Sequence, residues 1–106
     1  MDNEKQIENV LVVDDEAVVR NGISRALANR NIKTKLADSG KEALDLLRHQ
    51  KFDLVLLDIR MPDMDGITIL KKIRNEYPET AVVMITGYQT IDSAVHCVKL
   101  GALDYF

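Results

Sequence analysis

Short apolar runs alternate along this chain with segments of helical periodicity. These runs predict strands at residues 10–13, 54–57, 81–85 and 102–106, and a weaker strand signal lies at residues 32–36. Between them, apolar residues recur every three or four positions, as on the inner face of an amphipathic helix. The pattern predicts a βαβαβαβαβ order, and therefore an α/β fold built on a parallel sheet.

Local signals indicate where the first two helices begin and end. The second helix should follow a capping box of Ser39 and Glu42, bury Ala43, Leu46 and Leu47, and end near residues 49–51. The first helix should begin near Glu16. Its predicted inner face consists of Val19, Ile23, Ala26 and Leu27.

The last two helices carry equally clear stop signals. The third should begin around Gly66 and end before Pro78, with Ile69, Leu70 and Ile73 inside. The fourth should cover residues 89–100 and be capped by Gly101.

Right-handed crossovers then predict a doubly wound, five-stranded parallel sheet in the flavodoxin-like order 2-1-3-4-5. Residues 32–36 carry lysines at alternate positions, which suits an edge strand. Ligands of such sheets bind beyond the C-terminal ends of the strands, at the point where the strand order reverses. The residues of a functional site should therefore lie at this edge of the sheet.

Acidic residues follow two strands that should be neighbours. Asp14 and Asp15 follow residues 10–13, and Asp58 follows residues 54–57. Three such carboxylates repel one another unless a cation or proton lies among them, so they indicate a hard-metal site. An isolated Asp-Asp pair is more often a turn or a helix cap. Thr86, after the fourth strand, would add a hydroxyl at the same edge.

Composition limits the classes of protein to consider. The 106 residues suit one domain, expected at residues 9–106 after a polar tail at 1–8. A net charge of -3 without basic blocks argues against direct nucleic-acid binding. One cysteine excludes an internal disulfide, and no apolar run approaches the ~20 residues of a membrane helix. A cytoplasmic location with no membrane contact fits best.

Four motifs, in order and at compatible spacing, make the chain resemble a receiver domain of two-component response regulators. They are VVDDE at residues 12–16, LDIRMPDMDG at 57–66, ITG at 85–87 and GALDYF at 101–106. The stretch TGYQTIDSA at residues 86–94 further resembles receivers of the nitrogen-regulation class, which belong to transcription activators.

The resemblance implies a phosphoprotein rather than an enzyme, with only self-catalysed phosphotransfer and dephosphorylation. Asp58 would be the phosphoacceptor, taking its phosphoryl group from a sensor histidine kinase or a phosphotransfer protein. Asp14 and Asp15 would hold Mg²⁺, or Mn²⁺ as an alternative, together with Asp58 and the backbone carbonyl of Arg60.

The resemblance also implies a switch. Thr86 would be the switch hydroxyl that contacts the phosphoryl group, and Tyr105 the aromatic residue that turns inward with it. The output domain of the parent protein would bind DNA.

The chain departs from the family pattern at its C-terminal end. It stops at Phe106, before the lysine and the fifth helix that receivers normally have. The missing lysine would normally contact the phosphoryl group, and the missing helix would leave apolar sheet surface open. We therefore expect a sheet lacking that helix, and a homodimer or an exchange of the last strand driven by the open surface.

Three alternatives follow from other readings of the same residues. One is an interaction or dimerisation fragment that cannot be phosphorylated. Another is a haloacid-dehalogenase-like phosphotransferase, which needs a second acid two residues after the nucleophile, where this chain has Arg60. A dinucleotide-binding fold is disfavoured because no glycine-rich turn follows the first strand.

Asp63 and Asp65 are expected to shape or cap a turn rather than to bind metal.

Overall fold

The fold is a five-stranded parallel sheet covered by helices on both faces. The computed structural model describes residues 7–85 and 104–105. Its sheet has the predicted order β2-β1-β3-β4-β5. The strands are β1 (Asn9–Val13), β2 (Lys33–Ala37), β3 (Leu54–Asp58), β4 (Ala81–Ile85) and β5 (Asp104–Tyr105), and the helices are α1 (Ala17–Ala28), α2 (Gly40–His49) and α3 (Gly66–Glu76). The helix predicted at residues 89–100 lies outside the described residues.

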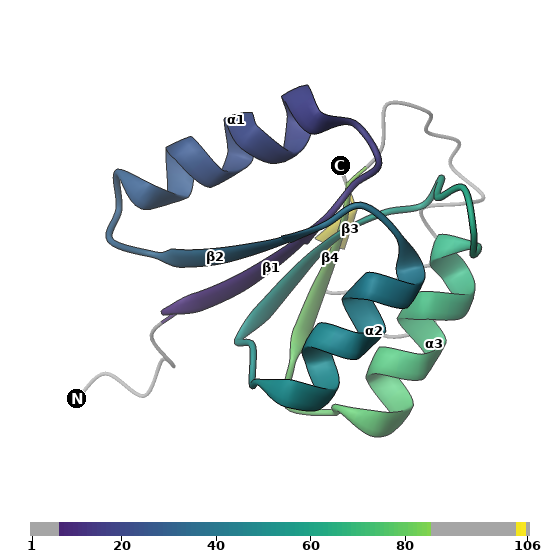
Figure 1. Cartoon of the computed structure of the whole chain (residues 1–106). Helices are drawn as coiled ribbons and strands as arrows, with labels where there is room; N and C mark the ends of the chain where they lie inside the picture. Colours follow the sequence, from purple (N-terminus) through teal and green to yellow (C-terminus); the bar gives the residue numbers. More distant parts are fainter. Residues whose placement is uncertain (1–6, 86–103, 106) are drawn as a thin grey trace.

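Helices α2 and α3 lie on one face of the sheet and α1 lies on the other (Figure 1). The main apolar core is on the α2 and α3 side, where alternate residues of β1, β3 and β4 meet the inner faces of both helices. The predicted inner residues Ile69, Leu70 and Ile73 of α3 are completely buried there. This confirms the periodicity argument for α3.

The prediction for α1 was correct in its start near Glu16 and wrong at one inner position. Val19, Ile23 and Leu27 are partly buried, whereas Ala26 is exposed. The packed face of α1 also includes two partly buried polar side chains. Arg20 donates a hydrogen bond to the Asp14 carbonyl (2.7 Å), and the Ser24 hydroxyl bonds that of Thr34 in β2 (2.8 Å). A pattern of apolar residues alone does not include these contacts.

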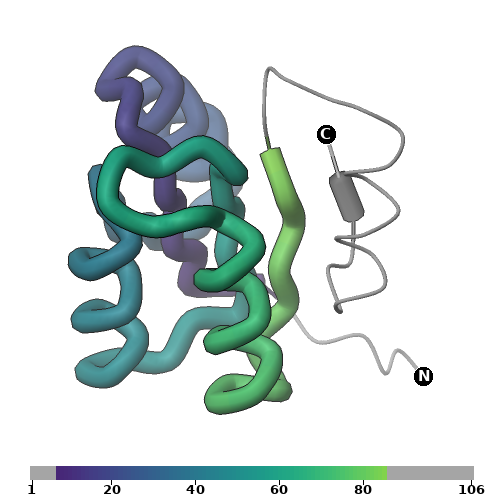
Figure 2. The backbone as a smooth tube through the Cα atoms, turned by 90° about the vertical axis from the view of Figure 1, so that its right-hand side faces the viewer, coloured from purple at the N-terminus to yellow at the C-terminus, as the bar shows by residue number. Residues whose placement is uncertain are grey.

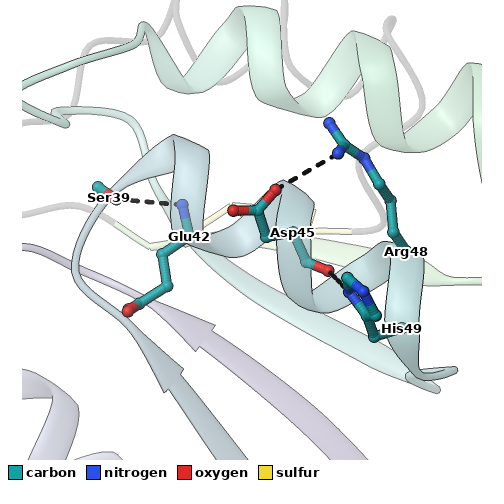
Figure 3. Close-up of polar contacts among 5 residues, drawn as sticks. All are labelled: Ser39, Glu42, Asp45, Arg48 and His49. Atoms are coloured by element: carbon teal, nitrogen blue, oxygen red, sulfur yellow. Dashed lines mark hydrogen bonds and ion pairs between the residues drawn. The ribbon is translucent and has the colours of Figure 1, made fainter.

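Helix α2 begins with the predicted cap, in modified form. The Ser39 hydroxyl accepts a hydrogen bond from the Glu42 backbone N–H at 3.2 Å (Figure 3). The Glu42 carboxylate accepts from the backbone N–H of Asp38, one residue before the cap, rather than from that of Ser39. The capping residue is therefore as predicted, but the reciprocal bond is displaced by one residue.

Candidate functional site

The site lies at the C-terminal edge of the sheet, where β1 and β3 end side by side. The two strands pair in parallel with Val13 opposite Leu57, so Asp14 and Asp58 follow at the same level. Both carboxylate residues are buried, with exposed fractions of 5% for Asp14 and 8% for Asp58. Asp15 is exposed beside them. The structure thus brings together the three acids predicted from the sequence.

Backbone contacts hold Asp14 in place. Its N–H donates to the carbonyl of Ala37 in β2 at 3.1 Å, and its carboxylate accepts from the Glu16 N–H at 2.9 Å. Its carbonyl accepts the Arg20 bond that orients α1. Arg20 was not predicted from the sequence, although a cation five residues after an acidic pair is a usable signal. The loop from β1 to α1 is therefore tied to both neighbouring elements.

The surroundings of Asp58 raise the pKa of its carboxyl group. Burial raises its pKa above the usual value of 3.8, and the negative charges of Asp14, Asp15 and Glu16 raise it further. A hydrogen bond from the Arg60 backbone N–H to the Asp58 carboxylate, 3.1 Å long, acts in the opposite direction. The net rise in pKa means that the ionised form of Asp58 lacks sufficient compensation from the protein alone.

The oxygen donors of this edge suit a hard divalent cation. Carboxylate oxygens of Asp14, Asp15 and Glu16 lie within 4.8 Å of one another. Burial and then like charge raise the Asp58 pKa, and a divalent cation among these oxygens would favour the ionised form against both effects. Oxygen is the ligand that Mg²⁺ prefers. Glu16 was predicted only as the start of a helix. Its place in the VVDDE motif was the signal that could have identified it.

The loop between β3 and α3 frames the other side of Asp58. Gly66 closes it by donating its N–H to the Ile59 carbonyl at 2.9 Å. A Cβ atom at Gly66 would lie only 2.5 Å from the Ile59 Cα and 2.7 Å from the Asp58 carbonyl oxygen, so any other residue would collide with backbone. Asp65 caps α3 by accepting the Ile67 N–H at 3.1 Å, as expected for a residue that shapes the turn.

The two remaining predicted site residues are the switch residues Thr86 and Tyr105. Thr86 comes directly after β4 and lies outside the described residues. The backbone of Tyr105 belongs to β5 and pairs with Met84 of β4. The assignment of both residues to a switch stays a prediction.

Comparison with known proteins identifies relatives over almost the whole chain. The family model of the response regulator receiver domain matches residues 10–106. The chain is 42% identical over 99 residues to the regulatory protein AtoC of Escherichia coli (strain K12), covering 93% of this chain and 22% of that protein. It is 37% identical over 97 residues to the DNA-binding transcriptional regulator NtrC of Proteus hauseri, covering 92% of this chain and 20% of that protein. The chain thus spans about a fifth of the length of these curated relatives.

Solved structures agree with this result. A response regulator protein from Burkholderia pseudomallei, crystallised with a phosphorylated aspartic acid, a calcium ion and citrate, superposes with a TM-score of 0.87 at 31% identity. The match covers 92% of this chain and 58% of that one. Among residues 7–85 and 104–105, no helix combines the length and apolar character needed to span a membrane.

Proposed function

Because the chain belongs to the response regulator receiver domain family, we propose that it accepts a phosphoryl group on Asp58. The observation that carries this proposal is the position of Asp58: a buried carboxylate at the end of β3, perturbed by three neighbouring acids. The similarity to NtrC is consistent with a receiver of the nitrogen-regulation class. We place the receiver at residues 9–106, after the polar tail at 1–8.

The reaction that we propose is a transfer between two protein side chains. A carboxylate oxygen of Asp58 attacks the phosphorus of a phosphohistidine on a sensor histidine kinase or a phosphotransfer protein. The new O–P bond forms as the P–N bond breaks, and the imidazole of the donor takes the bonding electron pair. The backbone N–H of Arg60, 3.1 Å from the carboxylate, helps to hold the acceptor in position.

The acidic edge would hold Mg²⁺, with Mn²⁺ as an alternative. We assign Asp14, Asp15, Asp58 and the backbone carbonyl of Arg60 as its ligands. When bound, the cation offsets negative charge on the transferred phosphoryl group. The clustered oxygens of Asp14 and Asp15 support their part in this assignment. The effect of both charges on the pKa of Asp58 supports the inclusion of Asp58. Glu16, exposed at the rim, is placed to attract the cation rather than assigned as a ligand.

Readout of the phosphoryl group would depend on Thr86 and Tyr105, which we propose as the switch hydroxyl and switch aromatic. Both follow from the matching motifs at residues 85–87 and 101–106. The output domain of the parent protein would bind DNA and regulate transcription, since NtrC of Proteus hauseri is a DNA-binding transcriptional regulator. The chain itself would be a cytoplasmic regulatory module with no enzymatic turnover of a small substrate.

A second copy of this chain is a further partner that we propose. Leu54, Leu56 and Val83 alternate with the core residues of β3 and β4, and they are only partly buried on the α1 side of the sheet. Apolar surface of this kind favours association. Sedimentation equilibrium should show a dimer at high protein concentration, and a monomer at every concentration would contradict this proposal.

Intact-mass spectrometry tests the phosphoacceptor directly. After incubation with phosphoramidate and Mg²⁺, the chain should gain the mass of one phosphoryl group, and omission of Mg²⁺ should remove most of the gain. Asp58→Asn should stay unlabelled, whereas Asp45→Asn, an acid on the surface of α2, should label normally. Absence of labelling in the wild type would favour the alternative function, an interaction fragment that cannot be phosphorylated.

A further inference from the structure

Asp63 makes a long-range contact that the proposed phosphotransfer does not by itself explain. Both of its carboxylate oxygens accept hydrogen bonds from the start of α2: one from the Gly40 N–H at 2.9 Å and the other from the Lys41 N–H at 3.0 Å. These residues are 23 and 22 positions earlier in the chain. Asp63 thus satisfies backbone donors that a helix N-terminus leaves without intrahelical partners.

The contact joins α2 to the loop that begins at the phosphoacceptor. Asp63 lies between Asp58, at the end of β3, and Gly66, at the start of α3. Figure 2 shows this loop arching over the end of the molecule at which α2 and α3 begin. Close packing reinforces the junction, because a Cβ atom on Gly40 would lie 2.9 Å from the Met64 Cβ. The middle of the loop is therefore held against α2.

The ends of the loop are fixed independently of α2. Asp58 accepts the Arg60 N–H, and Gly66 donates to the Ile59 carbonyl. The first bond holds the Arg60 N–H, whereas the Arg60 carbonyl begins the span to Gly66, and the path of that span depends on where its middle is anchored. Asp63, three residues after Arg60, supplies that anchor with two bonds to a separate helix.

Electrostatics favour the ionised form of Asp63. The two backbone donors lower the pKa of Asp63 below the usual value of 3.8. The partial positive charge of a helix N-terminus has the same effect on a carboxylate. At neutral pH the anchor is therefore fully formed, although the side chain is exposed to solvent.

We propose that Asp63 is a positioning residue for the cation site, because its two bonds to α2 fix the loop that carries Asp58 and the Arg60 carbonyl. This inference rests on the proposed function, since it assigns Arg60 to the bound Mg²⁺. Groups that orient metal ligands without touching the metal typically change affinity about 10-fold when they are removed. Without the two bonds of Asp63, part of the free energy of Mg²⁺ binding would be needed to order the loop, and the affinity would fall.

The chain offers a matched control in Ser39. Ser39 also caps α2, by accepting the Glu42 N–H, but it does not belong to the phosphoacceptor loop (Figure 3). Asp63→Ala and Ser39→Ala should both lower the melting temperature of the protein, because each removes a cap of the same helix. Only Asp63→Ala should weaken Mg²⁺ binding.

The test is a titration with Mg²⁺ alone, followed by the NMR shifts of the Arg60 and Asp58 amides in the absence of any phosphodonor. Asp63→Ala should raise the Mg²⁺ dissociation constant about 10-fold over that of Ser39→Ala. Asp63→Asn, which keeps one acceptor oxygen, should give an intermediate value and serves if the alanine variant does not fold. Equal dissociation constants in all four proteins would overturn the positioning role. Failure of the wild type to bind Mg²⁺ would instead contradict the proposed function on which the role depends.

Discussion

Asp58 and Asp63 are the same residue type in the same loop, yet their surroundings displace their pKa values in opposite directions. Asp58 lies among acids at the sheet edge, and burial and like charge raise its pKa. Asp63 faces the start of α2, whose backbone donors lower its pKa. The negative charge of Asp58, at the start of the loop, is therefore not compensated by the protein. The negative charge of Asp63, in the middle of the loop, is already stabilised by backbone donors of α2. The proposed phosphoacceptor and the proposed positioning residue thus differ in burial and in the groups that surround their carboxylates.

The largest expected effect comes from Gly66→Ala, which should disturb both carboxylates together. The added methyl group would meet backbone atoms of residues 58 and 59, which cannot move without shifting the loop. The free energy of unfolding should fall by about 2–3 kcal/mol, as for overpacked sites, and phosphorylation should be lost with it. Urea denaturation and intact-mass labelling measure the two consequences.

Gly22→Ala is the control for this substitution. A Cβ atom on Gly22, in the exposed part of α1, would meet nothing within 4 Å. Alanine in a helix interior should stabilise the protein by about 0.5–1 kcal/mol relative to glycine. Equal effects of the two substitutions would mean that the close approach at Gly66 does not constrain the loop.

Addition of Mg²⁺ should stabilise the folded protein through the acids around Asp58 and should leave the contacts of Asp63 unchanged. A cation that binds only the folded state at about 100 times its dissociation constant stabilises that state by about 2.7 kcal/mol. Asp15→Asn should reduce this gain, whereas Asp45→Asn should not, although both remove one negative charge. Thermal denaturation with and without Mg²⁺ measures the gain, and an equal gain in both variants would place the cation elsewhere.

The pH dependence of stability should have opposite signs for the two acids in Mg²⁺-free buffer. Because the folded pKa of Asp58 is raised, its contribution to stability is complete below the ordinary value of 3.8 and is lost as the pH rises through the raised value. Asp58→Asn should therefore stabilise the protein at neutral pH, and the gain should vanish in acid.

For Asp63 the folded pKa is lowered, so its contribution is present above 3.8 and is lost as the pH falls through the lowered value. Asp63→Asn should consequently destabilise the protein at neutral pH and have little effect in acid. Urea denaturation at a series of pH values from neutral into acid measures both profiles. Profiles of the same sign for the two variants would refute the contrast between these acids.

The smallest effect is expected at an acid that takes part in neither region. Asp45 forms an exposed ion pair with Arg48 on α2, with 3.5 Å between the charged atoms (Figure 3). Pairs of this kind contribute about 0.3–0.5 kcal/mol, so Asp45→Asn should change the free energy of unfolding by no more than that. Urea denaturation at neutral pH measures this change. A larger change would mean that the loss of any surface charge, rather than the local partners, accounts for the stability differences among these variants.

The sequence predicted the strands and the acidic edge well, because both depend on local pattern. Residues 81–85 form a continuous apolar run, so β4 was predicted at its observed limits. Asp14 and Asp58 followed from the parallel pairing of two such runs.

Contacts between distant segments were beyond the same reasoning. The partner of Asp63 is a helix that begins 23 residues earlier, and capping rules consider only near neighbours. Ala26 was misplaced for a related reason, since the packed face of α1 includes Arg20 and Ser24, whose side chains bond to residues outside the helix. The roles of Thr86 and Tyr105 stay predictions from the family motifs.

The measurement that tests the contrast most directly is an NMR titration of the aspartate carboxyl carbons, first without and then with saturating Mg²⁺. Without the cation, Asp58 should titrate above the usual value of 3.8 and Asp63 below it. Mg²⁺ should move the Asp58 midpoint strongly downward, because a bound cation favours the ionised form, and should leave the Asp63 midpoint nearly unchanged. Equal displacement of both midpoints, or no displacement of Asp58, would contradict the assignment of the cation and the phosphoryl group to the Asp58 end of the loop.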